Sequence, residues 1–257
     1  DAAFGTSVSI AHLSAIKGIP SYNLNEDDDD VVPLYSLLTY PFAPLILHPL
    51  CIRYTKWPHK RVLYPSYHEL AYLHPNNFTP DSEILKKYNL QEKKYIIVRF
   101  SSLNAHHDIG HRGISDHLWK KLETLCEGFE LVVSMEGEMS HNIDPWDMHH
   151  VLAFTKMIIS DSQTMTVEGA VLGVPAIRIN SFHNRCSVLD ELENKYELTF
   201  AYHPDEKENA LKKTSDILND GNSENVWNQR RKKLLKEKVD FNQWLIDFFY
   251  KDVRALG

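Results

Sequence analysis

The sequence predicts an α/β protein built around a doubly wound parallel sheet. Apolar, strand-like runs alternate with helix-like segments from residue 94 to about residue 202, and this alternation is typical of βαβ units. The clearest unit spans residues 157–179, where an apolar run, a polar turn, a short helix ended by Gly173 and a second apolar run follow one another. The 257 residues are 43% hydrophobic and 25% charged, which suffices for one large domain or two smaller ones.

The pattern before residue 94 is less regular. Residues 2–17 are predicted to form a turn and a helix, and residues 19–24 a strand. The apolar segment 33–48 contains three prolines and is predicted to be a broken helix. Short strands are expected at residues 51–54 and 61–64, and a helix at residues 81–88.

The acidic run EDDDD at residues 26–30 is predicted to be a hydrated loop, with a cation site as the alternative.

From residue 94 onward the elements follow from short apolar runs and from helix start and stop signals. Strands of parallel sheets are buried on both faces and are therefore continuously apolar. The predicted strands are residues 95–100, 129–133, 157–159 and 175–179. The predicted helices are residues 116–126, 148–155, 166–172, 190–195, 204–218, 224–238 and 241–253.

Composition excludes several classes of protein. The net charge of −7 and the pI of about 6.0 argue against an electrostatic nucleic-acid binder. The three cysteines are far apart and odd in number, so neither a disulfide framework nor a zinc spacing is expected, and a cytoplasmic setting fits best. No transmembrane run is visible. The first residues resemble the middle of a domain, so an incomplete N-terminal domain is expected.

The polar turn after residues 157–159 is the first candidate site. Its candidate ligands are Ser162, Gln163, Thr164 and, one turn into the helix, Glu168. Ligands of open parallel sheets bind where strand carboxyl ends meet helix amino ends. The free N–H groups of such a helix attract an anion, most simply a phosphate. The alternative is that Asp161 and Ser162 only cap the helix.

The loop after residues 95–100 is the second candidate, because it follows a strand at the same edge of the sheet. Its candidates are Arg99, Ser102, Asn104, His107, Asp108, His111 and Arg112. The histidines can act as acid, base or phosphate ligand, and Arg112 can neutralise a diphosphate. A metal is the alternative, but no fourth ligand stands at a zinc spacing. The sequence therefore predicts neither a metal nor a cofactor.

Two further residues are candidates. Met148, or Trp146 nearby, can offer a stacking face for a base, and the alternative is a cap at Asp147 with Met148 in the core. Glu69 can act as a general base if it faces a cleft, and the alternative is an ordinary surface carboxylate. P-loop, GxSxG, HExxH and CxxC motifs are absent from the sequence, which disfavours P-loop and triad chemistry.

Three segments carry a resemblance to a known family. VRFSSLNAHHDIGH, DMHHVLAF and SDSQTMTVEGAVLGVPAIRINSF resemble the DUF354 family, and this likeness covers nearly the whole chain. The family is similar to the glycosyltransferase-B (GT-B) fold and to the non-hydrolysing UDP-N-acetylglucosamine 2-epimerases. The resemblance implies a GT-B-like fold of two Rossmann-like domains with parallel sheets. Residues 1–80 would be the remainder of an incomplete N-terminal domain and the linker. Residues 81–240 would bind the nucleotide-sugar, and residues 241–257 would form a terminal helix that can cross back to the first domain.

The epimerase likeness rests on short motifs in the second half. In the epimerase turn D-S-G-G-x-x-E-E, the Ser meets the diphosphate and the second Glu holds the ribose hydroxyls. Asp161 and Ser162 match this turn, and Glu168 falls on the second Glu. The resemblance therefore implies separate roles for Ser162 and Glu168.

This chain also departs from the epimerase pattern. The two glycines are replaced by Gln163 and Thr164, and the first Glu by Val167. Met148 falls where the epimerases have an aromatic residue near the base. Their His-Arg pair after the first strand of the second domain is not reproduced in place.

The resemblance implies an enzyme that binds a nucleotide-sugar, UDP-linked, and acts on a glycan or lipid-linked acceptor. The expected reaction is glycosyl transfer in surface polysaccharide or glycoconjugate biosynthesis. Glu69, His107 and Asp108 are the expected catalytic residues. The alternatives are an epimerase acting by elimination and re-addition of UDP, and a non-catalytic nucleotide-sugar-binding protein. No nucleic-acid partner is expected, and a homodimer stays open.

Overall fold

The structure is a computed structural model that describes residues 2–53, 56–100, 113–135, 138–139, 141–181 and 185–255. Its contacts divide the chain into two compact units. Unit 1 comprises Asp1–Ala71, Arg185–Val188 and Lys238–Gly257, and unit 2 comprises Tyr72–Asn184 and Leu189–Glu237. The first boundary therefore falls after Ala71, whereas the sequence analysis places it after residue 80.

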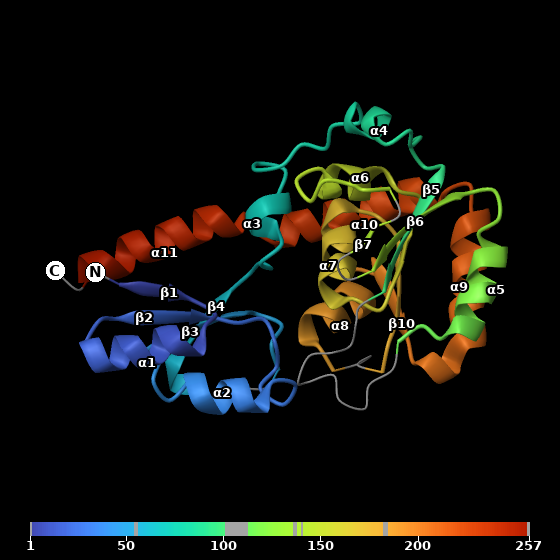
Figure 1. The fold of residues 1–257 in the computed structure, drawn as a ribbon. Coiled ribbons are helices and arrows are strands. Elements are labelled where there is room, and N and C mark those ends of the chain that lie inside the picture. Colours follow the sequence, from blue (N-terminus) through green and yellow to red (C-terminus); the bar gives the residue numbers. More distant parts are fainter. Residues whose placement is uncertain are drawn as a thin grey trace. The chain divides into compact units, whose positions relative to one another are not determined.

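Unit 1 contains a four-stranded parallel sheet with the order β1-β2-β3-β4. Helices α1 and α2 lie on one face of this sheet and α11 lies on the other (Figure 1). The strands are β1 Ala3–Gly5, β2 Ser21–Leu24, β3 Leu45–Pro49 and β4 Arg61–Tyr64. The helices are α1 Val8–Lys17, α2 Pro33–Thr39, the 3₁₀ turn Pro58–Lys60, α3 Leu70–Leu73 (whose second half belongs to unit 2) and α11 Phe241–Ala255.

Three predictions for unit 1 are wrong. Ala3–Gly5 is a strand and not a turn, and the predicted broken helix ends at Thr39 and is followed by the strand Leu45–Pro49. Of the strand predicted at residues 51–54, residues 51–53 are not in a strand, and residue 54 lies outside the described residues. The cause is pairing between distant segments, since β2 forms ladders with both β1 and β3. A short apolar run does not by itself distinguish a buried strand from a buried helix.

The acidic run is hydrated only in part, because Asp28 and Asp29 are 0% and 2% exposed, whereas Asp30 is exposed. The Asp28 carboxylate accepts hydrogen bonds from the Arg53 N–H at 3.1 Å and from the Ser187 N–H and hydroxyl, both at 2.7 Å. Asp29 accepts from the Lys56 N–H, and burial raises the pKa of Asp29. Backbone donors from later segments therefore compensate the burial of these acids.

Within unit 1, helix α11 packs against the sheet through aromatic side chains. The Phe241 ring lies 4.5 Å from Tyr64, and Phe248 and Phe249 lie 5.8 and 5.0 Å from Tyr22, measured between ring centroids. Aromatic residues spaced along one helix face bury a large apolar area. Among the described residues, no helix has both the length and the hydropathy that a membrane span requires.

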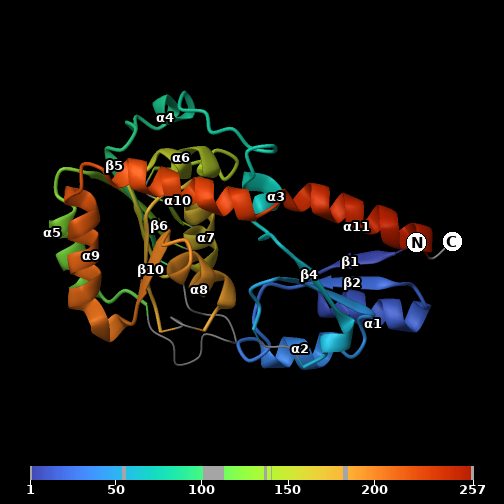
Figure 2. The ribbon, with the colours of Figure 1, turned by 180° about the vertical axis from the view of Figure 1, so that it is seen from behind.

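Unit 2 contains a six-stranded sheet with the order β10-β9-β8-β5-β6-β7, parallel except for β7. Helices α5 and α9 pack together on one face, and α7 and α10 pack together on the other (Figures 1 and 2). The strands are β5 Tyr95–Phe100, β6 Glu130–Met135, β7 Glu138–Met139, β8 Ile158–Ser160, β9 Ala176–Ile179 and β10 Thr199–Tyr202. The helices are α4 Ile84–Lys87, α5 Asp116–Leu125, α6 Met148–Phe154, α7 Gln163–Leu172, α8 Ser187–Asn194 (whose first two residues belong to unit 1), the 3₁₀ turn Pro204–Glu206, α9 Lys207–Asn219 and α10 Ser223–Glu237.

The strand order of unit 2 reverses between β5 and β8. Strand β5 pairs with β6 on one side and with β8 on the other, and Arg99 lies opposite Ser160 in the register. The predicted doubly wound parallel sheet is therefore confirmed. In such sheets the ligand crevice lies outside the strand carboxyl ends at this switch point, which here is the end of β5 and the start of α7.

Gly173 ends α7 and provides a first test of the packing. Its backbone is left-handed, with φ of 79°, and an added Cβ would lie 2.7 Å from Cδ of Arg231. The Arg231 side chain donates from Nε to the Val171 carbonyl at 2.8 Å. We expect Gly173→Ala to lower the free energy of unfolding by about 1–3 kcal/mol, from left-handed strain plus displacement of Arg231.

Urea unfolding of this variant checks the expectation. Gly221→Ala is the matched control, because Gly221 does not have a positive φ and an added Cβ there meets no atom within 4 Å. Equal stability of the two variants would contradict the assigned role of Gly173.

Candidate functional site

In the turn between β8 and α7, the Ser162 side chain makes no hydrogen bond to the described part of the chain. Ser162 is the N-cap of α7 with an extended backbone (φ −81°, ψ 135°), but its side chain makes no capping hydrogen bond. Its N–H instead donates to Oγ of Ser160 at 2.8 Å, and its own Oγ has no hydrogen-bond partner within the described part of the chain. Ser162 therefore occupies the N-cap position without capping the helix through its side chain.

The first turn of α7 suits an anion. The first N–H groups of an α-helix have no acceptor within the helix and carry a partial positive charge. This 10-residue helix has no acidic residue in its first turn, so no carboxylate of that turn competes for its N–H groups. Gln163 is half-buried and Thr164 is exposed, and both lie at this end as predicted.

Buried polar residues hold the turn between β8 and α7 in place through hydrogen bonds. The Asp161 N–H donates to the Arg99 carbonyl at 3.2 Å, and Nδ2 of Asn180 donates to the Asp161 carbonyl at 2.9 Å. Asn180 in turn accepts from Nη1 of Arg178 at 3.1 Å, and Arg178 is 1% exposed. Neither Arg178 nor Asn180 is among the residues predicted from the sequence. The sequence signal that could have found them is the charged Arg178 inside the apolar strand β9, because a buried charge needs a partner.

The turn is also closely packed against Gly113. A Cβ at Gly113 would lie 2.4 Å from Oδ2 of Asp161. Asp161 is 5% exposed, so its carboxylate has little room to move away. A side chain at residue 113 would therefore displace Asp161, and with it the start of α7.

Glu168 lies one turn further along α7 and is held by two side chains. Its Oε1 accepts from the Tyr72 hydroxyl and from Nε2 of His149, each at 3.0 Å, so His149 carries its proton at Nε2. The Glu168 side chain is 13% exposed, and Oε2 has no partner among the residues that the structure describes. The carboxylate is thus fixed in place with one oxygen left for a ligand hydroxyl.

Aromatic rings border Glu168. The Tyr72 ring centroid lies 5.1 Å from that of His149, and the Phe78 ring lies 4.8 Å from His150. His150 also accepts from the Asp81 N–H at 2.9 Å through Nδ1. The sequence analysis misses Tyr72 and His149, because residues distant along the chain give no local signal of a shared partner.

At the start of α6, the Asp147 side chain does not cap the helix as the alternative predicted. Asp147 makes no side-chain cap bond; its Oδ2 accepts from Nζ of Lys87 at 2.7 Å and from the Tyr88 hydroxyl at 2.6 Å. Met148 is half-buried beside His149, and Trp146 is 89% exposed. Asp147 therefore ties α6 to α4 instead of capping α6.

The remaining predicted residues are dispersed. Arg99 lies at the end of β5 and donates from Nη1 to Oγ of Ser134 at 2.6 Å. Glu69 belongs to unit 1 and is 8% exposed, so its interpretation as a surface carboxylate is wrong. Six predicted residues lie outside the described residues: Ser102, Asn104, His107, Asp108, His111 and Arg112. Within the described part of the chain, no group of three or more His, Cys, Asp or Glu residues could hold a metal ion.

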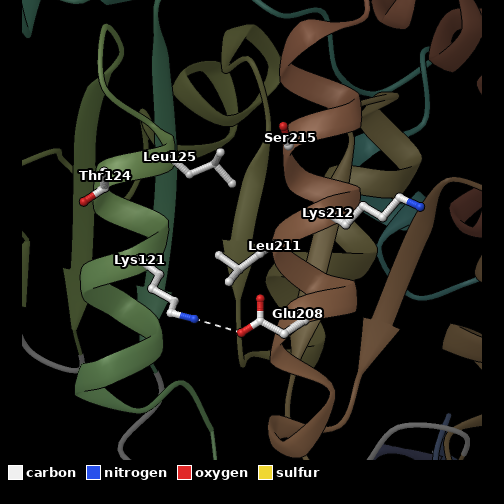
Figure 3. Close-up of a pocket in the computed structure, with 7 residues that line it drawn as sticks. All are labelled: Lys121, Thr124, Leu125, Glu208, Leu211, Lys212 and Ser215. Carbon is white, nitrogen blue, oxygen red and sulfur yellow. Dashed lines mark hydrogen bonds and ion pairs between the residues drawn. The ribbon is translucent and has the colours of Figure 1, made fainter.

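An open groove of about 560 Å³ lies between α5 and α9 (Figure 3). Lys121 and Glu208 form an ion pair across it at 2.8 Å. Its volume would suit a small ligand. However, Lys121 and Glu208 already pair with each other, and the groove lies on a helical face of the sheet instead of at strand carboxyl ends. The groove therefore does not compete with the switch point as the site.

No protein-family model and no curated protein matches the chain. Solved structures do match. The S. aureus MnaA–UDP co-structure is 14% identical with a TM-score of 0.66, over 99% of this chain and 76% of that one. Methanocaldococcus jannaschii UDP-GlcNAc 2-epimerase in complex with UDP-GlcNAc and UDP is 12% identical with a TM-score of 0.55, over 89% and 73%. The spinosyn rhamnosyltransferase SpnG complexed with spinosyn aglycone is 12% identical with a TM-score of 0.52, over 91% and 68%.

These likenesses confirm the predicted GT-B fold with its two Rossmann-like parts. At 12–14% identity they show the fold alone. Membership of the DUF354 family stays a prediction.

Proposed function

We propose that this chain is an enzyme that binds a nucleoside diphosphate sugar at the β5–β8 switch point of unit 2 and transfers the sugar to an acceptor hydroxyl. One observation carries the proposal. The start of α7 presents the uncommitted Ser162 hydroxyl, and the same helix presents Glu168 with one free oxygen. Neither the Ser162 hydroxyl nor the second oxygen of Glu168 makes a hydrogen bond to the described part of the chain. Each suits a different part of one ligand.

The diphosphate belongs at the helix N-terminus, where unpaired N–H groups and the helix dipole favour negative charge. Ser162 adds a hydrogen-bond donor there. Glu168 lies six positions after Ser162, a rise of about 9 Å along the helix, so an extended ligand can reach both. The free oxygen of Glu168 accepts hydrogen bonds, as a ribose diol requires.

Transfer breaks the bond between the anomeric carbon and the diphosphate, and the leaving group takes the electron pair. Donors already aimed at the diphosphate stabilise this developing charge without reorganisation. Uridine is the proposed base, supported by the UDP in the S. aureus MnaA co-structure and the UDP-GlcNAc and UDP in the M. jannaschii complex. A glycan or lipid-linked acceptor in surface polysaccharide or glycoconjugate assembly is the proposed partner.

A UDP-GlcNAc 2-epimerase is the second candidate, because epimerases are among the solved structures with TM-scores of 0.55–0.58. Proton NMR of a UDP-N-acetylhexosamine in deuterated water separates the two activities. An epimerase changes the sugar without an acceptor and incorporates deuterium at C2. A transferase releases UDP and leaves the C2 proton in place.

The nucleotide site is tested by calorimetry with UDP. We expect Ser162→Ala and Glu168→Gln each to weaken UDP binding by roughly tenfold to a hundredfold, because each loses a hydrogen bond to or from a charged group, worth about 1.5–3 kcal/mol. Uridine alone should lose affinity with Glu168→Gln but not with Ser162→Ala, since uridine has no phosphate.

Two matched controls lie on the opposite face of the sheet, Ser215→Ala on α9 and Glu123→Gln on α5. Both should bind UDP like the wild type. UDP affinity that is the same in all four variants would place the nucleotide elsewhere.

A further inference from the structure

Glu168 on α7 receives both of its hydrogen bonds on a single oxygen. The Tyr72 hydroxyl and Nε2 of His149 each donate to Oε1 at 3.0 Å, and Oε2 has no partner among the residues that the structure describes. All three residues belong to unit 2. Donors on either oxygen would compensate the burial of this side chain, which is 13% exposed. Because both donors converge on Oε1, they also fix the direction in which Oε2 points.

The two donors come from elements that lie far apart in the sequence. Tyr72 is on α3 and His149 is on α6, 96 and 19 residues from Glu168. Their ring centroids are 5.1 Å apart with an angle of 37° between the ring planes, so the two rings pack against each other. Phe78 adds an edge-to-face contact to His149, with the centroids 6.2 Å apart. The two donors are therefore parts of one packed aromatic group.

Helix α6, which carries His149, is anchored at its start. Oδ2 of Asp147 accepts from Nζ of Lys87 at 2.7 Å and from the Tyr88 hydroxyl at 2.6 Å. Asp147 stands two residues before His149. The imidazole therefore reaches Glu168 from a helix whose start is held by contacts that do not involve a nucleotide.

A fixed Oε2 can distinguish ligands by their hydroxyl groups. Rotation about the last side-chain bond of a glutamate is broad, so an unrestrained carboxylate samples many orientations. Two donors on Oε1 of Glu168 remove this freedom before a ligand arrives, which lowers the ordering cost of binding. A carboxylate oxygen can accept two hydrogen bonds. A ribose presents its 2′- and 3′-hydroxyl groups side by side, whereas a 2′-deoxyribose lacks one of them.

We propose that Tyr72 and His149 are positioning residues that hold Glu168 for the 2′-hydroxyl group of the nucleotide, and that they make the site selective for ribonucleotides over 2′-deoxyribonucleotides. The inference rests on the proposed function, which places a nucleoside diphosphate along α7 with its ribose at Glu168. Both residues act through the Glu168 carboxylate and not by contact with the ligand.

Calorimetry with UDP and with 2′-deoxy-UDP measures this selectivity. We expect the wild type to bind UDP roughly tenfold to a hundredfold more tightly, because 2′-deoxy-UDP lacks one hydrogen bond to a charged oxygen. Tyr72→Phe and His149→Phe each keep an aromatic ring and remove one donor to Oε1. We expect each variant to lower the ratio of the two affinities by roughly threefold to tenfold, mainly through weaker UDP binding. An unchanged ratio in both variants would overturn the proposal.

A rescue variant and a matched control separate positioning from a general loss of structure. His149→Gln places an amide donor near the position of Nε2 and should recover part of the ratio that His149→Phe loses. His141 also pairs through Nε2 with a glutamate, Glu130, at 2.8 Å, but at the amino end of β6. His141→Phe should therefore leave the ratio at its wild-type value. An equal fall of the ratio in His141→Phe and His149→Phe would count against the assigned role of His149.

A double-mutant cycle tests whether Tyr72 acts through Glu168. In Glu168→Ala no carboxylate remains to be positioned, so adding Tyr72→Phe should change the ratio by less than about twofold. Fully additive effects of the two substitutions would show that Tyr72 acts independently of Glu168, and its role as a positioning residue would be wrong.

The inference and the proposed function give different results when they fail. A wild-type chain that binds UDP and 2′-deoxy-UDP equally keeps the nucleotide site and overturns the selectivity. A wild-type chain that binds neither nucleotide contradicts the proposed function, and the inference with it.

Discussion

Acidification from pH 6.5 to pH 4 is expected to destabilise unit 1 by about 3 kcal/mol through His48 alone. The side chain is 0% exposed, and burial lowers its pKa to about 4 from an ordinary value of 6.5. A difference of about 2.5 pKa units at about 1.4 kcal/mol per unit gives this figure.

The sign follows from proton binding. Between pH 6.5 and 4 the unfolded chain protonates His48, and the folded chain does not. The free energy of unfolding therefore falls as the pH falls, and below pH 4 the loss is complete. His68 contributes in the same direction, since burial lowers its pKa to about 3. Glu26 contributes in the opposite direction, because a raised pKa removes stability as the pH rises from its ordinary value to the raised one.

Urea unfolding of wild type and His48→Asn across this pH range provides the measurement. Asparagine can still donate to the Asn25 carbonyl, which His48 contacts at 2.8 Å, but it cannot be protonated. We expect the variant to lose about 3 kcal/mol less than the wild type between pH 6.5 and 4. His59→Asn replaces an exposed histidine and controls for the loss of an imidazole as such. Parallel pH profiles for wild type and His48→Asn would contradict the assigned neutrality of His48.

The second half of the chain could be predicted from sequence because its signals are local. Strands such as Tyr95–Phe100 and Ile158–Ser160 are buried on both faces and are therefore apolar runs. Gly173 marks the end of α7 because the left-handed conformation at that position favours glycine. The reversal of strand order at β5 was not readable from local pattern, since it depends on which strands pair.

Some residues of the candidate site could likewise be predicted from the sequence, and others could not. Ser162 and Glu168 stand on one helix at a spacing that a motif can encode, so the sequence predicts them. The partners of Glu168 are His149, 19 residues away, and Tyr72, 96 residues away. Residues that meet only in the folded chain leave no periodic signal. The same holds for Asp28, which looks hydrated in sequence but is bound by Ser187, 159 residues away.

The ionisable side chains around Glu26 in unit 1 could not be predicted from local sequence pattern. Glu26 stands in an acidic run that the sequence predicts to be hydrated, and His68 lies 42 residues later in the chain, next to Glu69. The structure places all three at one sheet edge, because β2 and β4 both end there. The Glu69 carboxylate lies near enough to help raise the pKa of Glu26, and the role of Glu69 as a base stays a prediction.

Replacing Phe241 is expected to have the largest effect on stability of any substitution argued for this chain. Its side chain is 2% exposed, and its ring centroid lies 4.5 Å from Tyr64, 5.6 Å from His68 and 6.1 Å from Trp244. Truncating a buried phenylalanine removes its burial energy and leaves a cavity, so Phe241→Ala should lower the free energy of unfolding of unit 1 by about 3–5 kcal/mol.

Urea unfolding and hydrogen exchange across α11 provide the measurement. Tyr250→Ala is the matched control, because Tyr250 lies on the same helix but is 66% exposed, and it should cost little. Equal costs for the two variants would contradict the packing of α11 through its aromatic residues.

Phe241 also links the packing of unit 1 to the ionisation of Glu26. It packs on both Tyr64 and His68, the two residues that donate to Oε1 of Glu26. A cavity beneath these donors loosens them, admits water and reduces the desolvation that raises the pKa of Glu26. Phe241→Leu, which keeps most of the buried volume, should cost less stability. In carbon-13 NMR of the chain labelled at its glutamate carboxyl carbons, Phe241→Leu should lower the pKa of Glu26 toward its ordinary value, whereas Tyr250→Ala should leave this pKa unchanged.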